Sequence, residues 1–419
     1  MSTELPRSIA TAPVFPFFTE KDDKLTSAPG GRDLLGILPV WSAIGRNLVP
    51  NIASPAAKLD GLRAILLIEW LAQQPAFDVT LRPQPAFRRY FRLMEGIVEF
   101  WLRKNGGRQC FGRNALVGGA DDFTVKASTR GIVANGLFQY YRGTCRRAGY
   151  VQANGTVCQS VQETLSAIWK PQIVKRMHDV LAQAIGKEAG EIQPLTILAA
   201  APELDRALGD TFAFHTFHAL FSSTLFGNAA QRTLASVYGG LPLGSLKNRV
   251  ALLESPELQH EIDCVRRCEP FLVSLYDVFD LLRNAAGQRT GSVAARLVEF
   301  HAVLAARARD FLTLAGEVQS ARMRDILGLA QCLVEDLSGS EDGLKRFIHA
   351  LIDYHQRCMA ERGKEPVIRV ESDHLLVLLD GDRSPDVIAD SLRNAATWRN
   401  DYFLNVAAGL YLELFPVNS

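Results

Sequence analysis

Residues 128–158 read STRGIVANGLFQYYRGTCRRAGYVQANGTVC, and this stretch decides which fold the sequence predicts. In its first half, apolar and aromatic residues such as Ile132 and Tyr141 recur at helical spacing, with arginines late in the predicted helix. Its second half has two short β-compatible runs on either side of Asn154 and Gly155. Asn-Gly between such runs is a strong signal for a tight hairpin.

A further helix is expected after the hairpin, from about Ser160 to Lys170. The order of helix, hairpin and helix over about 128–170 is typical of a winged helix-turn-helix, in which basic residues late in the helix face the phosphate backbone. The alternative is a helical domain with one surface hairpin, since helices followed by a β-turn occur in many folds. The predicted nucleic-acid-binding residues are Arg142, Arg146 and Arg147, supported by Arg88, Arg89 and Arg92.

The charge distribution points to the same part of the chain. The 419 residues contain 46 Lys and Arg against 45 Asp and Glu, a formal net charge of +1. Between Arg82 and Tyr150, however, 13 basic residues face 4 acidic ones, so this segment carries +9 and the rest of the chain −8. Such a basic lobe is expected of a surface that meets phosphate or docks on an acidic partner.

Proline, glycine and hydrophobic periodicity divide the chain into three parts. Seven of the nineteen prolines lie in the first 55 residues, so we expect an extended N-terminal arm over 1–32. Residues 33–240 are expected to form the basic helical lobe. Apolar residues three and four apart predict a C-terminal helical bundle over 241–419. The expected fold is therefore mainly α and two-lobed.

Near the C-terminus the hydrophobic period changes from helical to strand-like. The runs PVIRVE and HLLVLL flank Ser372 and Asp373, which predicts a small β-hairpin over about 366–379 within the bundle.

No pattern in the sequence predicts a catalytic residue, a cofactor or a metal. His215-x2-His218 and Cys264-x3-Cys268 could together supply a tetrahedral zinc set. Structural zinc usually takes its cysteines from a tight turn, whereas both pairs lie in predicted helices among apolar neighbours. The sequence also has no phosphate-binding glycine loop and no Gly-x-Ser-x-Gly elbow. Whether the chain is an enzyme stays open, with a non-enzymatic protein favoured.

Carboxylates and imidazoles lie next to one another near the C-terminus. We interpret Asp353-x-His355 as helix residues and Asp373-His374 as hairpin-turn residues. Glu371, Asp373 and Asp380 border the predicted hairpin, but no lysine stands at the two-residue spacing that strand-borne nuclease sites commonly use. A metal-dependent nuclease whose carboxylates meet only in the fold remains an alternative.

Cysteine usage and hydropathy predict a cytoplasmic location. The seven cysteines follow no framework spacing, which is typical of reduced thiols. We find no signal peptide and no run of about 18 apolar residues that would span a membrane. We therefore expect no membrane contact.

Two segments in the N-terminal part of the chain resemble segments of known proteins. Residues 33–52 contain DLLGILPVW and LVPNI, and after a predicted helix residues 87–95 read FRRYFRLME. This pattern resembles uncharacterised bacterial proteins of antiphage-defence and mobile-element gene neighbourhoods, over about the first 160 residues. The resemblance implies a helical, DNA-associated or complex-forming accessory subunit, and it carries over no catalytic residue.

These observations predict a non-enzymatic nucleic-acid-binding or scaffold subunit of a bacterial multi-protein system, of the antiphage-defence kind. Its expected partners are nucleic acid, first of all duplex DNA, and other protein subunits of the same system. The alternatives are the metal-dependent nuclease and a pure protein-assembly scaffold whose arginine-rich lobe meets an acidic partner.

Overall fold

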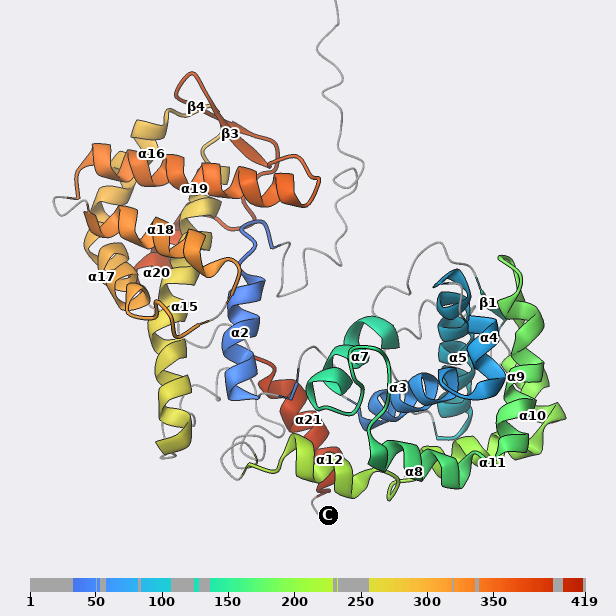
Figure 1. Ribbon diagram of the computed structural model, residues 1–419. Coiled ribbons are helices and arrows are strands. Elements are labelled where there is room, and N and C mark those ends of the chain that lie inside the picture. Colours follow the sequence, from blue (N-terminus) through green and yellow to red (C-terminus); the bar gives the residue numbers. More distant parts are fainter. Residues whose placement is uncertain are drawn as a thin grey trace, which may run out of the picture. The chain divides into compact units, whose positions relative to one another are not determined.

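The computed structural model is mainly helical, with two small antiparallel two-stranded sheets (Figure 1), which confirms the predicted fold class at this level. The N-terminal arm predicted over 1–32 and the boundary predicted between 240 and 241 lie outside the described residues. The structure describes residues 33–49, 51–52, 58–81, 84–106, 124–127, 136–228, 232, 256–318, 320–335, 339–394 and 402–416.

The chain groups into two compact units. Unit 1 comprises Met1–Val40 and Arg266–Thr397, and unit 2 comprises Trp41–Val265 and Trp398–Ser419. Two of the three limits between the units fall within helices, namely α2 (Leu38–Leu48) and α15 (Pro256–Arg283). None of the described helices is long and apolar enough to cross a membrane.

Unit 2 contains most of the predicted basic lobe. Its short sheet pairs β1 (Val125–Lys126) with β2 (Glu191–Ile192). Its further helices are α3 (Leu59–Ala72), α4 (Pro75–Leu81), α5 (Gln84–Lys104), α7 (Leu137–Arg147), α8 (Gln159–Ile168), α9 (Pro171–Ile185), α10 (Pro194–Ala200), α11 (Pro202–Thr211), α12 (His218–Leu225) and α21 (Leu404–Leu414).

Helix α3 is the centre of unit 2. Every residue from Gly61 to Leu71 is buried, as expected of a helix that is apolar on nearly all sides. The helix packs closely against α7 at Gly61, where an added Cβ would overlap the ring of Tyr141. The absence of a side chain at this position therefore lets the two helices approach.

The structure describes part of the segment for which the sequence predicts a winged-helix-like element. Helix α7 ends at Arg147, Val151 and Val157 form one isolated antiparallel bridge around the Asn154 and Gly155 turn, and α8 follows. The predicted helix and turn are thus observed, whereas the predicted strands are reduced to a single bridge. Residues 128–135 lie outside the described part of the chain.

Unit 1 contains the predicted hairpin. Strands β3 (Ile368–Glu371) and β4 (His374–Val377) pair antiparallel, and β3 lies along α19 (Figure 1). The two turn residues, Ser372 and Asp373, have φ of 48° and 71°, the left-handed pair that a two-residue hairpin turn requires. The other helices of unit 1 are α16 (Thr290–Leu297), the 3₁₀ helix η1 (Val298–Phe300), α17 (His301–Leu312), α18 (Met323–Glu335), α19 (Glu341–Glu361) and α20 (Pro385–Arg393).

The hairpin turn is fastened to two helices of unit 1 through Asp373. Its carboxylate accepts a hydrogen bond of 2.5 Å from the Thr290 hydroxyl at the start of α16. It also forms an ion pair of 2.8 Å with Lys345 of α19. Both interactions lower the pKa of Asp373. These contacts agree with the interpretation of Asp373 as a turn residue.

A second set of charged residues joins α15 to the segment that leads into α20. Arg383 forms ion pairs with Asp277 at 2.6 Å and with Asp280 at 2.9 Å. The buried Asp277 also accepts a hydrogen bond of 2.7 Å from Ser391 of α20. Arg283 pairs with Asp280 at 2.9 Å, so each carboxylate is compensated within the unit.

Candidate nucleic-acid interface

A cleft of about 460 Å³ in unit 2 brings two of the six predicted arginines together. Arg88 reaches it from α5 and Arg142 from α7, and the turn at Asn154 and Gly155 forms part of its wall. Acidic, amide and aromatic side chains complete the lining. Among these are Glu69, Gln73, Asp78, Phe87 and Phe138.

Arg142 is held in the cleft by a carboxylate and two aromatic rings. Its Nε donates a hydrogen bond to Oε1 of Glu69. Its guanidinium carbon lies 4.8 Å from the ring centroid of Phe138 and 5.7 Å from that of Phe87. A cation over an aromatic face is attracted by the ring quadrupole. Arg142 is therefore fixed in orientation and largely neutralised by the chain itself.

Glu69 is the buried partner of this arginine. The residue is 2% exposed, and burial raises the pKa of its carboxyl above the ordinary value, while the charges of Arg142 and Arg146 oppose that shift. Arg146 thus lies close enough to act on Glu69, although its own side chain is exposed. Two arginines of α7, Arg142 and Arg146, thus act on the buried carboxylate at the cleft.

The 153–155 turn is fastened to this wall. Nε2 of Gln73 donates to the Gly155 carbonyl oxygen at 2.8 Å, and Nη2 of Arg146 donates to that of Ala153 at 3.2 Å. Gly155 has φ of 90°, and a Cβ there would lie 3.1 Å from Oε2 of Glu69. Glycine at position 155 therefore allows the turn to form and lets its backbone lie close to the buried carboxylate of Glu69.

Two other predicted arginines are bound within the chain. Arg89 donates from Nη1 to the Ile185 carbonyl oxygen at 3.1 Å. Arg92 forms an ion pair of 3.6 Å with Glu95, which also accepts a hydrogen bond of 2.5 Å from the Leu137 amide. Burial raises the pKa of Glu95 to about 7, although the Leu137 amide and Arg92 oppose the shift. These residues connect α5 to α9 and α7.

The remaining three predicted arginines, Arg88, Arg146 and Arg147, are exposed. Arg147 ends α7 and lies near Arg46 of α2 in the same unit, since partial burial and the like charge of Arg46 both lower the pKa of Arg147. Unit 2 thus presents exposed guanidinium groups beside the cleft and at the end of α7.

Two of the predicted arginines, Arg88 and Arg142, line this cleft, whereas sequence reasoning missed its buried acid. Glu69 lies in the run AILLIEWLA, where it is the one charged residue in an otherwise apolar helix segment. A lone carboxylate in such a run must be paired when it is buried. That signal was present in the sequence, but the partner lies 73 residues away, and only the fold joins the two.

Other candidate groups have partners within the fold. Nε2 of His218 lies 2.9 Å from the Leu414 carbonyl oxygen. His355 is buried, with Nδ1 2.9 Å from the Leu34 carbonyl oxygen and Nε2 accepting from the Val367 amide at 3.0 Å. Two carboxylates, Glu69 and Asp78, line the cleft.

Comparisons with known proteins add no further constraint. The chain gives no significant match to a protein family, to a curated protein or to a solved structure.

Proposed function

We propose that this chain is a non-enzymatic nucleic-acid-binding subunit whose exposed arginines, Arg88, Arg146 and Arg147, contact the phosphate backbone. The observation that carries this proposal is the cleft, because Arg88 and Arg142 line it and Arg146 acts on its buried carboxylate. Guanidinium groups bind phosphate oxygens through charge-assisted hydrogen bonds in a planar fork. Several exposed arginines on one unit suit a repeating polyanion.

The two halves of the charge distribution have different roles in this proposal. The segment at about 128–170 acts as a winged-helix-like element of a basic lobe, which contacts duplex DNA. The more acidic remainder forms a second lobe, which contacts other protein subunits. The resemblance of residues 33–52 and 87–95 supports a place in a bacterial antiphage-defence system in the cytoplasm.

Arg142 is a positioning residue in this proposal. Its ion pair with the buried Glu69 offsets its charge, and its contact with Phe138 fixes its plane. Replacing Arg142 would leave a buried carboxylate uncompensated, which typically costs several kcal/mol of stability. A loss of binding in an Arg142 variant would therefore not distinguish a lost contact from a damaged fold.

The test is fluorescence-anisotropy binding to labelled duplex DNA, single-stranded DNA and RNA across a salt series. We expect salt-sensitive binding by the wild type. The triple variant Arg88→Ala, Arg146→Ala, Arg147→Ala should bind all sequences more weakly by a similar factor. The slope of log K against log salt is about −0.9 per phosphate contact, so losing three contacts should make it less steep by about 2.7.

The matched control is Lys175→Ala, Lys187→Ala, Arg206→Ala, which removes the same charge from exposed positions of unit 2 outside the cleft lining and outside the 128–170 segment. We expect this control to keep most of the wild-type affinity and slope. Equal weakening of both variants would show that net charge alone attracts the nucleic acid. Absence of wild-type binding at low salt would overturn the proposal.

A protein-assembly scaffold is the second candidate, and one observation favours it. Arg89, Arg92 and Arg142 are already bound to acceptors of this chain, as expected of an arginine network that stabilises a docking surface. If nucleic acid does not bind, co-purification of an acidic protein partner through the exposed arginines becomes the expected result. The triple alanine variant should then lose that partner.

A further inference from the structure

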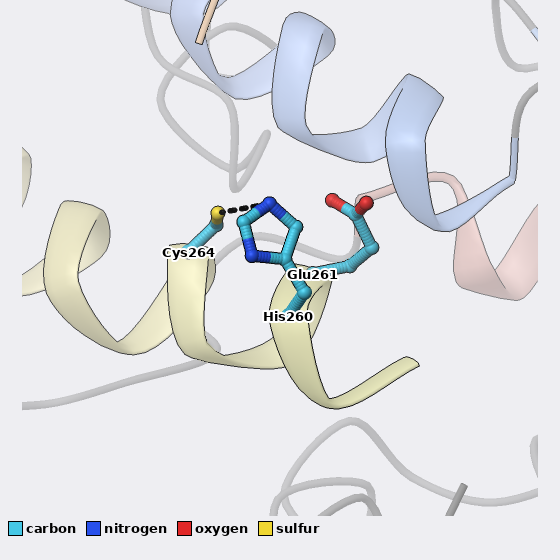
Figure 2. A group of neighbouring side chains, drawn as sticks. All are labelled: His260, Glu261 and Cys264. Carbon is cyan, nitrogen blue, oxygen red and sulfur yellow. Dashed lines mark hydrogen bonds between the residues drawn. The ribbon is translucent and has the colours of Figure 1, made fainter. Parts of the chain in front are cut away.

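Three potential metal ligands lie together at the beginning of α15, in the part of that helix that belongs to unit 2. They are His260, Glu261 and Cys264 (Figure 2). One ligand atom from each lies within 4.8 Å of the other two. Across the described residues, this is the one group of three or more His, Cys, Asp or Glu side chains that meets this distance.

The spacing of the imidazole and the thiol suits a tetrahedral ion. His260 and Cys264 are four residues apart, so they lie on one face of the helix, and Figure 2 shows the ring edge turned toward the sulfur. Nε2 of His260 is 3.9 Å from Sγ of Cys264. Tetrahedral zinc separates a sulfur and a nitrogen ligand by about 3.6 Å, so a shift of about 0.3 Å would close the site.

The carboxylate of Glu261 provides an independent indication. Its Oε2 atom is buried and has no hydrogen-bond partner among the described residues. A buried carboxylate oxygen without a partner is costly, and a bound cation would satisfy it. Cys264 is 1% exposed, so the sulfur lies on the protein side of the group and the exposed His260 on the solvent side.

We propose that His260, Glu261 and Cys264 bind a zinc ion. Thiolate and imidazole ligands select zinc over magnesium and calcium, which prefer oxygen ligands alone. The Cys264 thiol would release its proton to solvent as the zinc–sulfur bond forms. Three ligands from one helix leave the fourth tetrahedral position to a water molecule or to a further group.

This site differs from the zinc set that the sequence pattern suggested and that we judged unfavourable. That set paired Cys264 with Cys268 and with two histidines, of which His218 lies against the Leu414 carbonyl oxygen. The structure instead places His260, one helical turn before Cys264, beside the sulfur.

The test uses the purified full chain, stripped with a chelator and titrated with Co²⁺ as a spectroscopic substitute for zinc. We expect one cobalt per chain, with the charge-transfer absorption that a cobalt–thiolate bond gives, and loss of that band when Zn²⁺ is added. Cys264→Ser should abolish the band. His260→Gln, at an exposed position where the fold is not at risk, should weaken cobalt binding by at least about tenfold.

Two control variants match these changes in residue type. His215→Gln alters an exposed histidine and Cys158→Ser a partly exposed cysteine, both in unit 2 and outside the group. Both should keep the band and the affinity. A wild-type chain without the band, or a band that survives in Cys264→Ser, would overturn the proposal. Neither result depends on nucleic-acid binding.

Discussion

At the scale of single residues, His355 has its protonation state set by the fold. The Val367 amide donates to Nε2, so Nδ1 carries the proton that is donated to the Leu34 carbonyl oxygen. Burial lowers the pKa of His355 to about 4, and the nearby charges of Arg283 and Arg362 act in the same direction. The neutral ring is therefore part of the folded structure.

This burial predicts a loss of stability in mild acid. Below the ordinary pKa of 6.5 the unfolded chain binds a proton at His355 that the folded chain does not bind until about pH 4. The free energy of unfolding should fall between these values, by up to about 3 kcal/mol. Urea unfolding of the wild type and of His355→Gln at pH 7.5 and 4.5 measures this fall in the free energy of unfolding.

The test compares the free energy of unfolding of wild type with that of His355→Gln at each pH, because Glu95 changes the stability of both proteins with pH in the opposite direction. Its pKa is raised to about 7, so the folded chain binds a proton there before the unfolded chain does, and stability from this group increases as pH falls. We expect His355→Gln to be less stable than wild type at pH 7.5, with a smaller difference at pH 4.5. A constant difference would contradict the assignment.

At the scale of secondary-structure elements, replacing Arg383 should cost more stability than replacing Arg393, because only Arg383 pairs with a buried carboxylate. Arg383→Ala would leave the buried Asp277 without its closest charge partner and should lower the free energy of unfolding by about 3 kcal/mol. Arg393→Ala removes pairs with Glu299 and Asp390 whose side chains are all more than half exposed, so its cost should stay below about 1 kcal/mol. Chemical denaturation of both variants tests this order.

Elements with a strong local signal could be predicted from the sequence. The sequence predicts a helix from Pro85 to Lys104, and α5 runs from Gln84 to Lys104; the hairpin around Ser372 and Asp373 is likewise observed. Apolar residues at helical spacing, such as Val293, Leu297 and Leu304, also predict one helix over 292–315. The structure instead has the 3₁₀ turn η1 within this range, which the sequence does not reveal because the apolar spacing continues unchanged through the interruption. For the pairing of Arg142 with Glu69, the lone carboxylate in an apolar run is the one local signal, and the identity of its partner depends on tertiary contacts.

At the scale of the whole molecule, the C-terminal helix belongs to the unit formed by the first half of the chain. Glu413 of α21 forms an ion pair with Lys58 at 2.9 Å and accepts a hydrogen bond of 2.8 Å from the Leu59 amide, at the start of α3. Dividing the sequence into consecutive segments does not predict that α21 packs on unit 2, because hydrophobic periodicity identifies a helix but not the unit on which it packs.

Truncation after Thr397 tests this arrangement. The cut removes the Glu413 contacts and the buried Leu404, Leu410 and Leu414, which should lower the free energy of unfolding of unit 2 by about 5 kcal/mol or more. A cut after Pro416, which keeps α21, is the control. Scanning calorimetry should show a lower melting temperature for the first truncation alone, and equal melting temperatures would contradict the assignment of α21 to unit 2.

The ion pair between Arg142 and Glu69 would couple the binding of an anion at Arg142 to proton uptake by Glu69. An anion that drew Arg142 away would leave a buried carboxylate whose pKa burial already raises. Protonation removes that uncompensated charge, so the two events are thermodynamically linked. Anions that engage Arg142 would therefore be held more tightly in acid than in base, whereas contacts through the exposed arginines alone would not share that dependence.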